Sequence, residues 1–175
     1  MKSYKLQSSV TVEAPHCEVF QSVFSYDLLE VFDGFSFLPR FVHPAFDRNS
    51  DGEGSQRLIY FEGMFTVRQQ LLSVVPGSTF LVRLTDFKLL RLYWLRSLDY
   101  QFCFFVLSPG HTLMRCEYTF LVRTPLWDFL FRRYVQKVLQ DRINAFLVSM
   151  SKKLSYCSDF QQAEGINFLK EKESY

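Results

Sequence analysis

Two hydrophobic periods follow one another at the start of the chain. Apolar and polar residues alternate over residues 4–13, which is the period of a half-buried strand. Pro15 stands where a first helical residue is expected, and later apolar residues recur every three or four positions. This pattern predicts a strand, a helix of about twelve residues and a short helical turn over residues 28–32. The apolar positions are Tyr4, Leu6, Val10 and Val12 in the strand and Val19, Phe20, Val23, Phe24 and Leu28 in the helices.

The middle of the chain has the pattern of six more strands, separated by turn-forming residues. The Pro76-Gly77-Ser78 and Ser108-Pro109-Gly110-His111 sequences have the composition of tight turns. An edge strand is expected near residues 41–47, before a polar turn at 48–54. The other strands are expected at residues 55–62, 64–75, 79–87, 94–107 and 112–123.

The last two predicted strands each have one apolar face. A slip of one residue turns every side chain over, so the two apolar faces coincide only when paired residue numbers add to an even total. We expect Phe102 opposite Tyr118 and Tyr100 opposite Phe120, with a three-residue loop over residues 109–111. The two faces consist of Trp94, Leu98, Tyr100, Phe102, Phe104 and Val106, and of Met114, Cys116, Tyr118, Phe120 and Val122.

The C-terminal third predicts one amphipathic helix of about 30 residues, roughly 45 Å long, which begins after Thr124-Pro125. Its apolar stripe consists of Leu126, Leu130, Tyr134, Val138, Leu139, Ile143, Phe146, Leu147, Met150 and Leu154. Residues from about 156 onward mix polar and isolated apolar side chains and predict a loosely held tail. We therefore expect a single domain over residues 1–155 and a tail over residues 156–175.

Composition narrows the class of protein. The chain has 175 residues and is 48% hydrophobic, which suits one domain with a substantial core. A formal charge of +2 and a pI near 8.3 are too mild to indicate a nucleic-acid partner. The N-terminus has no apolar segment of the signal-peptide type, and no uncharged run is long enough to span a membrane. We expect a soluble, cytoplasmic protein.

The cysteines and histidines show no arrangement for metal binding or nucleophilic catalysis. The four cysteines lack CxxC spacing and nearby histidines, so we expect four reduced thiols, no metal site and no cofactor. Cys103 and Cys116 should lie on opposite faces of their hairpin, where they cannot form a disulfide. No Ser, His and Asp arrangement is supported by the spacing either. The cysteines are Cys17, Cys103, Cys116 and Cys157, and the histidines are His16, His43 and His111.

The order of these elements resembles the helix-grip fold of the SRPBCC superfamily, which includes START lipid-binding domains, polyketide cyclases and the birch-pollen allergen family. The resemblance covers residues 4–154. It rests on Val10-Thr11-Val12-Glu13-Ala14-Pro15 leading into Val19-Phe20, Gly54 before a strand, the Val75-Pro76-Gly77 turn, Trp94 and the Ser108-Pro109-Gly110-His111-Thr112 hairpin. A His-rich pattern found in one bacterial group is missing from residues 94–100, which argues against a shared activity with that group.

The resemblance implies an α+β fold, in which a curved antiparallel sheet of about six or seven strands surrounds the last helix and leaves a hydrophobic tunnel. Members bind lipids, sterols, quinones, plant hormones or polyketide intermediates, and some are cyclases or hydrolases. No catalytic motif is shared by the whole family, so the fold does not decide the chemistry.

The candidate ligand-binding residues are the apolar hairpin face and the helix positions expected opposite it. They are Trp94, Arg96, Leu98, Tyr100, Phe102, Phe104, Cys116, Tyr118, Phe120, Tyr134, Val138 and Phe146. Arg96 has the parity of its apolar neighbours and would hold a carboxylate or an enolate-like oxygen; alternatively it reaches water or pairs with Asp86 or Glu62. The hydroxyls of Tyr100, Tyr118 and Tyr60 would orient a ligand, or else they belong to the packed core.

The sequence thus predicts a protein that binds a lipid, quinone or polyketide-like molecule between the sheet and the last helix. One alternative is a cyclase, aromatase or hydrolase that uses the same cavity, although no catalytic signature favours it. The other is a lipid or quinone chaperone that acts with a membrane or protein partner. Six basic and two acidic residues over residues 125–155 would suit an anionic membrane surface, and equally a solvated helix face. The oligomeric state stays open.

Overall fold

Seven strands form one antiparallel sheet in the order β1-β7-β6-β5-β4-β3-β2. The computed structural model describes the backbone of residues 2–25, 41–42, 53–61, 65–88, 92–123, 129 and 131–172, and the side chains of these residues except 41–42, 61, 65 and 156–172. The strands are β1 Lys2–Val12, β2 Phe41–Val42, β3 Gln56–Phe61, β4 Phe65–Val75, β5 Thr79–Thr85, β6 Leu95–Ser108 and β7 His111–Val122. The helical turn expected at residues 28–32 and most of the edge strand expected at 41–47 lie outside these residues.

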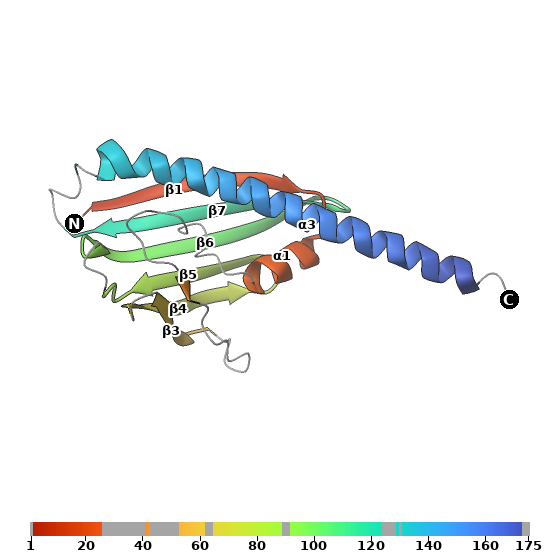
Figure 1. Ribbon diagram of the computed structural model, residues 1–175, viewed down its shortest axis with the longest axis horizontal. Helices are drawn as coiled ribbons and strands as arrows, with labels where there is room; N and C mark the ends of the chain where they lie inside the picture. The colour runs from red at the N-terminus through yellow and green to blue at the C-terminus, as the bar shows by residue number, and fades with distance from the viewer. Residues whose placement is uncertain are drawn as a thin grey trace.

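The helices pack on one face of this sheet, which curves around them (Figure 1). Helix α1, His16–Ser25, follows β1 as predicted, and it contacts β6 and β7. A π-helix, η3 at Phe131–Val135, leads into α3, Gln136–Lys172, which runs along β1. The predicted architecture of a curved antiparallel sheet and a long C-terminal helix is thus confirmed. No helix among the described residues is long and apolar enough to cross a membrane.

The last helix is longer than the sequence pattern indicated. We expected it to end near Leu154, but α3 continues to Lys172 and extends past the end of the sheet (Figure 1). The polar composition after residue 155 removes the amphipathic stripe without interrupting the helical backbone, because these residues include only one glycine and no proline. The spacing of apolar residues shows which part of a helix is buried, but it does not show where the helix ends.

Side chains of α3 bind backbone groups of β1 along the free side of that strand. The Gln140 side-chain amide donates to the Gln7 carbonyl at 3.0 Å, and the Ser151 hydroxyl donates to the Thr11 carbonyl at 3.1 Å. The Glu13 backbone amide just beyond β1 donates to the Ser155 hydroxyl at 3.3 Å. An edge strand offers unpaired backbone groups to other chains, and these bonds occupy several of them.

The β6–β7 hairpin has the predicted parity but not the predicted register. Tyr100 pairs with Tyr118 and Phe102 with Cys116, two residues away from the expected pairing. The loop holds only Pro109 and Gly110, and Gly110 has the positive φ of 85° that suits its place after a proline in a type II turn. This loop alone would give an odd pairing total. An irregularity between residues 106 and 108 adds one residue to β6 and returns the apolar side chains to one face.

The inner face of the sheet, which faces the helices, consists of cross-strand rows of side chains. One row runs across five strands and consists of Leu71, Val82, Tyr100, Tyr118 and Leu6. The next row consists of Gln69, Leu84, Leu98, Phe120 and Tyr4. These residues are buried except Tyr4, which is partly buried. The core therefore lies between this face and the helices, with one buried amide, that of Gln69, among its side chains.

Candidate functional site

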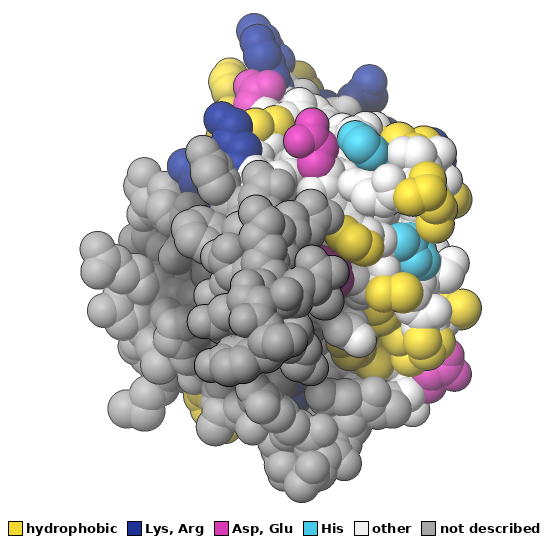
Figure 2. Space-filling model, turned by 90° about the vertical axis from the view of Figure 1, so that its right-hand side faces the viewer, with side chains coloured by type: hydrophobic (Ala, Val, Ile, Leu, Met, Phe, Trp, Pro, Cys, Tyr) yellow, Lys and Arg dark blue, Asp and Glu magenta, His cyan; other side chains and the backbone are white. Residues whose placement is uncertain are grey.

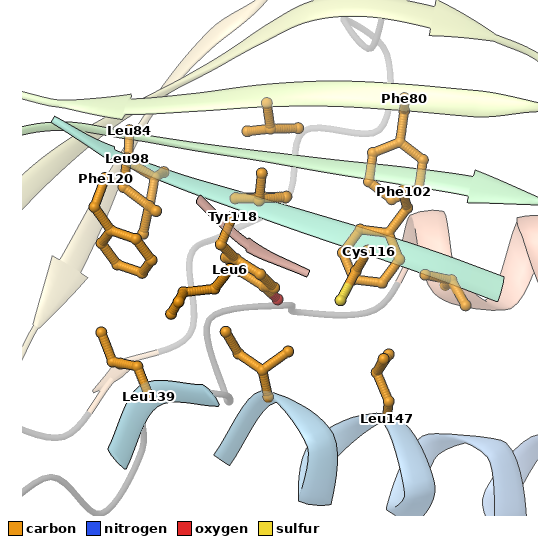
Figure 3. Close-up of a cluster of buried hydrophobic side chains, with 14 of the residues drawn as sticks. Leu6, Phe80, Leu84, Leu98, Phe102, Cys116, Tyr118, Phe120, Leu139 and Leu147 are labelled. Atoms are coloured by element: carbon orange, nitrogen blue, oxygen red, sulfur yellow. The ribbon is translucent and has the colours of Figure 1, made fainter. Parts of the chain in front are cut away.

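The two central tyrosines of the inner face lie side by side. The ring centroids of Tyr100 and Tyr118 are 6.0 Å apart, and Phe102 meets Tyr118 edge to face at 6.4 Å. Figure 3 shows Tyr118 directed from the sheet toward α3, where Leu139 and Leu147 point back at it. Both tyrosine rings are buried, as the parity of the hairpin predicted.

A polar network crosses the inner face and ends at Tyr100. The Arg57 Nε on β3 donates to the side-chain oxygen of Gln69 on β4, and the Gln69 amide nitrogen donates to the Tyr100 hydroxyl at 2.5 Å. A guanidinium only donates, so it fixes the Gln69 oxygen toward Arg57 and the nitrogen toward Tyr100. The Tyr100 hydroxyl oxygen therefore accepts this bond and is held in a fixed place on the inner face.

Sequence reasoning did not identify Arg57 or Gln69. The signal was present in β4, where Gln69 has the same parity as Val67 and Leu71 and is 6% exposed. A polar residue at a buried strand position needs a hydrogen-bond partner. Arg57 lies directly opposite Gln69 in the β3–β4 pair, so the strand register brings the two together.

Two apolar side chains beside this network keep a small exposed fraction, unlike the centre of the hairpin. Phe102, Cys116 and Tyr118 are completely buried, so no space large enough for a water molecule adjoins them. Leu71 and Val82, next to Gln69, are 8% and 6% exposed. The sheet residues expected to bind a ligand, on β6 and β7, are therefore mostly packed, and the slightly exposed Leu71 and Val82 lie on β4 and β5, outside the expected set.

Arg96 does not face the interior, and this corrects the expectation from parity. The pairing of β6 with β7 shifts between Leu95 and Ser97, so Arg96 is the extra residue of a β-bulge in β6. Leu95 and Trp94 are both buried as a result, whereas Arg96 is exposed. Strict alternation, on which the prediction rested, fails at such a point. Leu98, Phe104 and Phe120 keep the predicted inward orientation.

Two of the three helix positions proposed for the site are also corrected. Tyr134 is 61% exposed and Val138 is 47% exposed, whereas Phe146 is partly buried against the core. Near its start the helix has apolar residues on two sides. The π-helix turns the side that contains Phe131 toward the sheet, which leaves Tyr134 and Val138 on the exposed side. The buried positions are Phe131, Leu139, Ile143, Leu147 and Met150. Tyr60, another proposed hydroxyl, lies on the outer side of β3 and is 49% exposed.

Aromatic clusters lie at both ends of the inner face. At one end, the Phe131 ring centroid is 4.7 Å from Tyr4, 5.6 Å from Trp94 and 5.3 Å from Phe120. At the other end, Phe20 and Phe24 of α1 pack against the sheet aromatics Phe80, Phe102 and Phe104. Seven of the chain's 20 phenylalanines therefore pack in these two clusters.

Burial raises the pKa values of two ionisable groups of the core, Cys116 and Tyr118. Burial raises the pKa of the Cys116 thiol to about 12. Burial, and then the nearby Cys116 and Tyr100, raise the pKa of Tyr118 well above its usual value. A thiol of this kind is a poor nucleophile, in agreement with the packing role considered from sequence. Cys17, Cys103 and Cys116 are free, and no cluster of metal-ligating side chains occurs in the described part of the chain.

Comparisons with solved structures identify the fold. Zhui aromatase/cyclase from Streptomyces sp. R1128 is 16% identical with a TM-score of 0.58, over 87% of this chain and 94% of that one. Ara h 8.0201 is 14% identical with a TM-score of 0.53, over 85% and 99%. A START superfamily protein from Mycobacterium smegmatis is 13% identical with a TM-score of 0.52, over 90% and 98%.

Sequence comparisons add nothing to this result. No protein-family model and no curated protein sequence matches the chain. At these low identities the likeness concerns the fold, and the fold leaves ligand and chemistry undecided. With its seven-stranded curved sheet around a long C-terminal helix, the chain has the helix-grip fold of these structures, which is the fold that the resemblance in its sequence predicted.

Proposed function

We propose that the protein binds a hydrophobic small molecule against the inner face of β4, β5 and β6, and that this molecule carries an oxygen that accepts a hydrogen bond from Tyr100. The observation that carries the proposal is the buried contact of Gln69 with Tyr100 on a largely apolar face, beside the slightly exposed side chains of Leu71 and Val82. Lipids, quinones and polyketide-like molecules all combine apolar bulk with such an oxygen.

The polar network suits ligand recognition better than packing. A buried amide needs partners, and a purely apolar row would avoid that requirement. Binding pockets, by contrast, are mostly apolar and have a few convergent polar groups that orient the ligand. The charge of Arg57 acts through the Gln69 amide and strengthens Tyr100 as a donor, because hydrogen bonds in a chain polarise one another.

The residues proposed for the site differ in part from those expected from sequence. We propose that Gln69, Leu71, Val82, Leu98 and Tyr100 contact the ligand, and that Trp94 borders one end. Phe102, Phe104, Cys116, Tyr118 and Phe120 support this surface from within the packed region. The similarity in fold to an aromatase/cyclase and to a START superfamily protein supports a small-molecule role of this kind.

Two tricyclic probes that differ by a carbonyl group test the proposal. Anthrone has the carbonyl and 9,10-dihydroanthracene lacks it, so their affinities can be compared by displacement of a fluorescent apolar dye. We expect anthrone to bind about 2- to 10-fold more tightly, which is the worth of one hydrogen bond. Tyr100→Phe should abolish this preference, whereas Tyr118→Phe, in the packed region, should retain it. Equal affinities in the unmodified protein, or a preference that survives Tyr100→Phe, would contradict the proposal.

A second candidate function is an enzyme of the aromatase or cyclase type, in which the same phenol donates a proton to a bound carbonyl. The directed Gln69–Tyr100 bond favours it, because it fixes the position of a hydroxyl group on an apolar face, where a bound carbonyl could meet it. Incubation with a polyketide-like substrate and mass analysis of the products would distinguish the two. If product forms with the original chain and fails to form with Tyr100→Phe, while the probe still binds to that variant, the enzyme is supported.

A further inference from the structure

One end of the molecule exposes aromatic and basic side chains together. We call it the basic end and define it by Tyr93, Arg123, Phe129, Arg132, Arg133 and Tyr134. It lies where β7 leaves the sheet and the last helix begins, on the left in Figure 1. Tyr93 and Phe129 are each 64% exposed, which is unusual for two large aromatic side chains so close to the core.

Packing beneath this surface holds its segments together. The Phe131 ring contacts Trp94 at a centroid distance of 5.6 Å, and the Arg123 backbone amide donates to the Trp94 carbonyl at 2.9 Å. These contacts join the segment before β6, the end of β7 and the π-helix. Residues adjacent to the buried anchors Phe131 and Trp94, among them Arg132 and Tyr93, therefore emerge at one end.

Cations and aromatic rings are paired on this surface. The Arg123 guanidinium lies 4.8 Å from the Tyr93 ring centroid, and the Arg133 guanidinium lies 5.6 Å from that of Tyr134. The rings are thus held at the surface beside positive charge. Among the described residues of segments 92–96, 120–123 and 129–140, none is acidic, so no carboxylate from these segments offsets the charge.

The opposite end of the molecule has a different character. Figure 2 shows that end, where apolar side chains lie together with histidines and acidic groups, and basic side chains stand along its upper edge. Val106 and Leu107 are exposed at the hairpin tip, and the segments next to it carry Glu13 and Glu18. Exposed apolar side chains therefore occur at both ends, and the aromatic–cation pairs distinguish the basic end.

We propose that the basic end docks on the surface of an anionic lipid bilayer. Tyrosine and other aromatic rings prefer the boundary between water and acyl chains, and arginine side chains bind the phosphates and carboxylates of anionic headgroups. A nucleic acid is a poorer fit, because the chain as a whole has a formal charge of only +2. This docking does not depend on the ligand proposed above, since none of its residues belongs to the inner face.

Vesicle flotation with two double variants of equal charge tests the proposal. The vesicles are phosphatidylcholine alone or phosphatidylcholine with about 30% phosphatidylserine, at low and high salt. Arg132→Gln with Arg133→Gln changes the basic end, and Lys152→Gln with Lys153→Gln makes the same change of charge further along α3. We expect binding to the anionic vesicles only, weakened about 25-fold by the first pair, at about fivefold per charge, and weakened by salt. The second pair should leave the vesicle partition close to that of the original chain.

A tryptophan reporter tests contact at the ring itself. Tyr134→Trp should give emission that shifts to the blue on anionic vesicles and is quenched by brominated lipid, because the ring enters the interface. Tyr93 and Phe129 stay unchanged in this variant. The proposal is overturned if the protein ignores anionic vesicles, if both charge pairs weaken binding equally, or if the reporter emission does not shift. Tighter binding to a short DNA duplex than to anionic vesicles would overturn it in favour of a nucleic-acid partner.

Discussion

The side-chain amide of Gln69 donates a 2.5 Å hydrogen bond to the hydroxyl of Tyr100, and both side chains are buried. Gln69 comes from β4 and Tyr100 from β6, in neighbouring cross-strand rows on either side of β5. The hydrogen bond between them therefore crosses β5, whose inward-facing side chains are apolar. We therefore expect the stability of the fold to depend on the pair, in addition to the binding proposed above.

Removal of the Tyr100 hydroxyl should destabilise the protein. Tyr100→Phe leaves the Gln69 amide nitrogen buried without this acceptor, at a cost of about 1–3 kcal/mol in the free energy of unfolding. Gln69→Leu combined with Tyr100→Phe removes both partners and should cost clearly less than the sum of the single changes. Urea denaturation of the four chains measures the coupling. Additivity within about 0.5 kcal/mol would show that the two groups do not interact.

The phase of the last helix can be tested with two residues three positions apart. Phe131 packs against Tyr4, Trp94 and Phe120, so Phe131→Ala should lower the free energy of unfolding by about 3–5 kcal/mol. Tyr134 is 61% exposed, and Tyr134→Ala should change it by at most about 0.5 kcal/mol. Thermal or urea unfolding gives both values. Similar losses for the two variants would mean that the π-helix does not select the buried side.

Alkaline pH should destabilise the fold through its core. The pKa of Cys116 is raised from 9.0 to about 12, so above pH 9 the unfolded chain releases a proton that the folded chain retains. Stability then falls with rising pH by about 1.4 kcal/mol per unit until the folded thiol also ionises near pH 12. Tyr118, whose pKa is also raised, adds to the decline above pH 10. Unfolding of Cys116→Ala between pH 9 and 11 should show a shallower slope, and parallel curves would refute this origin.

Thiol reactivity should separate Cys17 from Cys116. Cys17 is exposed on α1, whereas Cys116 is completely buried and has a raised pKa. With iodoacetamide at mildly alkaline pH, peptide mapping should find Cys17 modified and Cys116 unmodified, because only an accessible thiolate reacts. In urea both should react. Modification of Cys116 in the folded protein would show that the inner face opens beside β7.

Alternation of side chains was sufficient to predict most of the sheet and its buried face. It predicted the inward orientation of Tyr100 and Tyr118, because two long strands with one dry face each have only one way to share it. It failed at Arg96, since one extra residue in β6 reverses the alternation there. Pairing was also displaced by two residues, because an irregularity near Leu107 preserves parity while it shortens the loop.

The polar part of the site was not accessible to the same reasoning. Arg57, Gln69 and Tyr100 come from three strands, and their bonds depend on side-chain reach across rows as well as on strand order. The spacing of apolar residues describes one strand or helix at a time, so it cannot show contacts between side chains of different strands. Only the buried position of Gln69 within β4 hinted at a partner. The helix positions Tyr134 and Val138 failed for a related reason, because both sides of the helix start are apolar and tertiary packing chooses between them.

The position of β1 also determines when the chain can complete its fold during synthesis. This strand is made before its ladder partner β7, which begins at residue 111, and before the α3 side chains that bind it, which extend to Ser155. At roughly 5–20 residues per second, β1 waits on the order of ten seconds for its partners to be translated. Leu6 and Val12 are apolar and find their buried positions only then. During this interval Leu6 and Val12 stay exposed on an unpaired strand whose other face is polar, and unpaired strand edges of this kind are prone to aggregation.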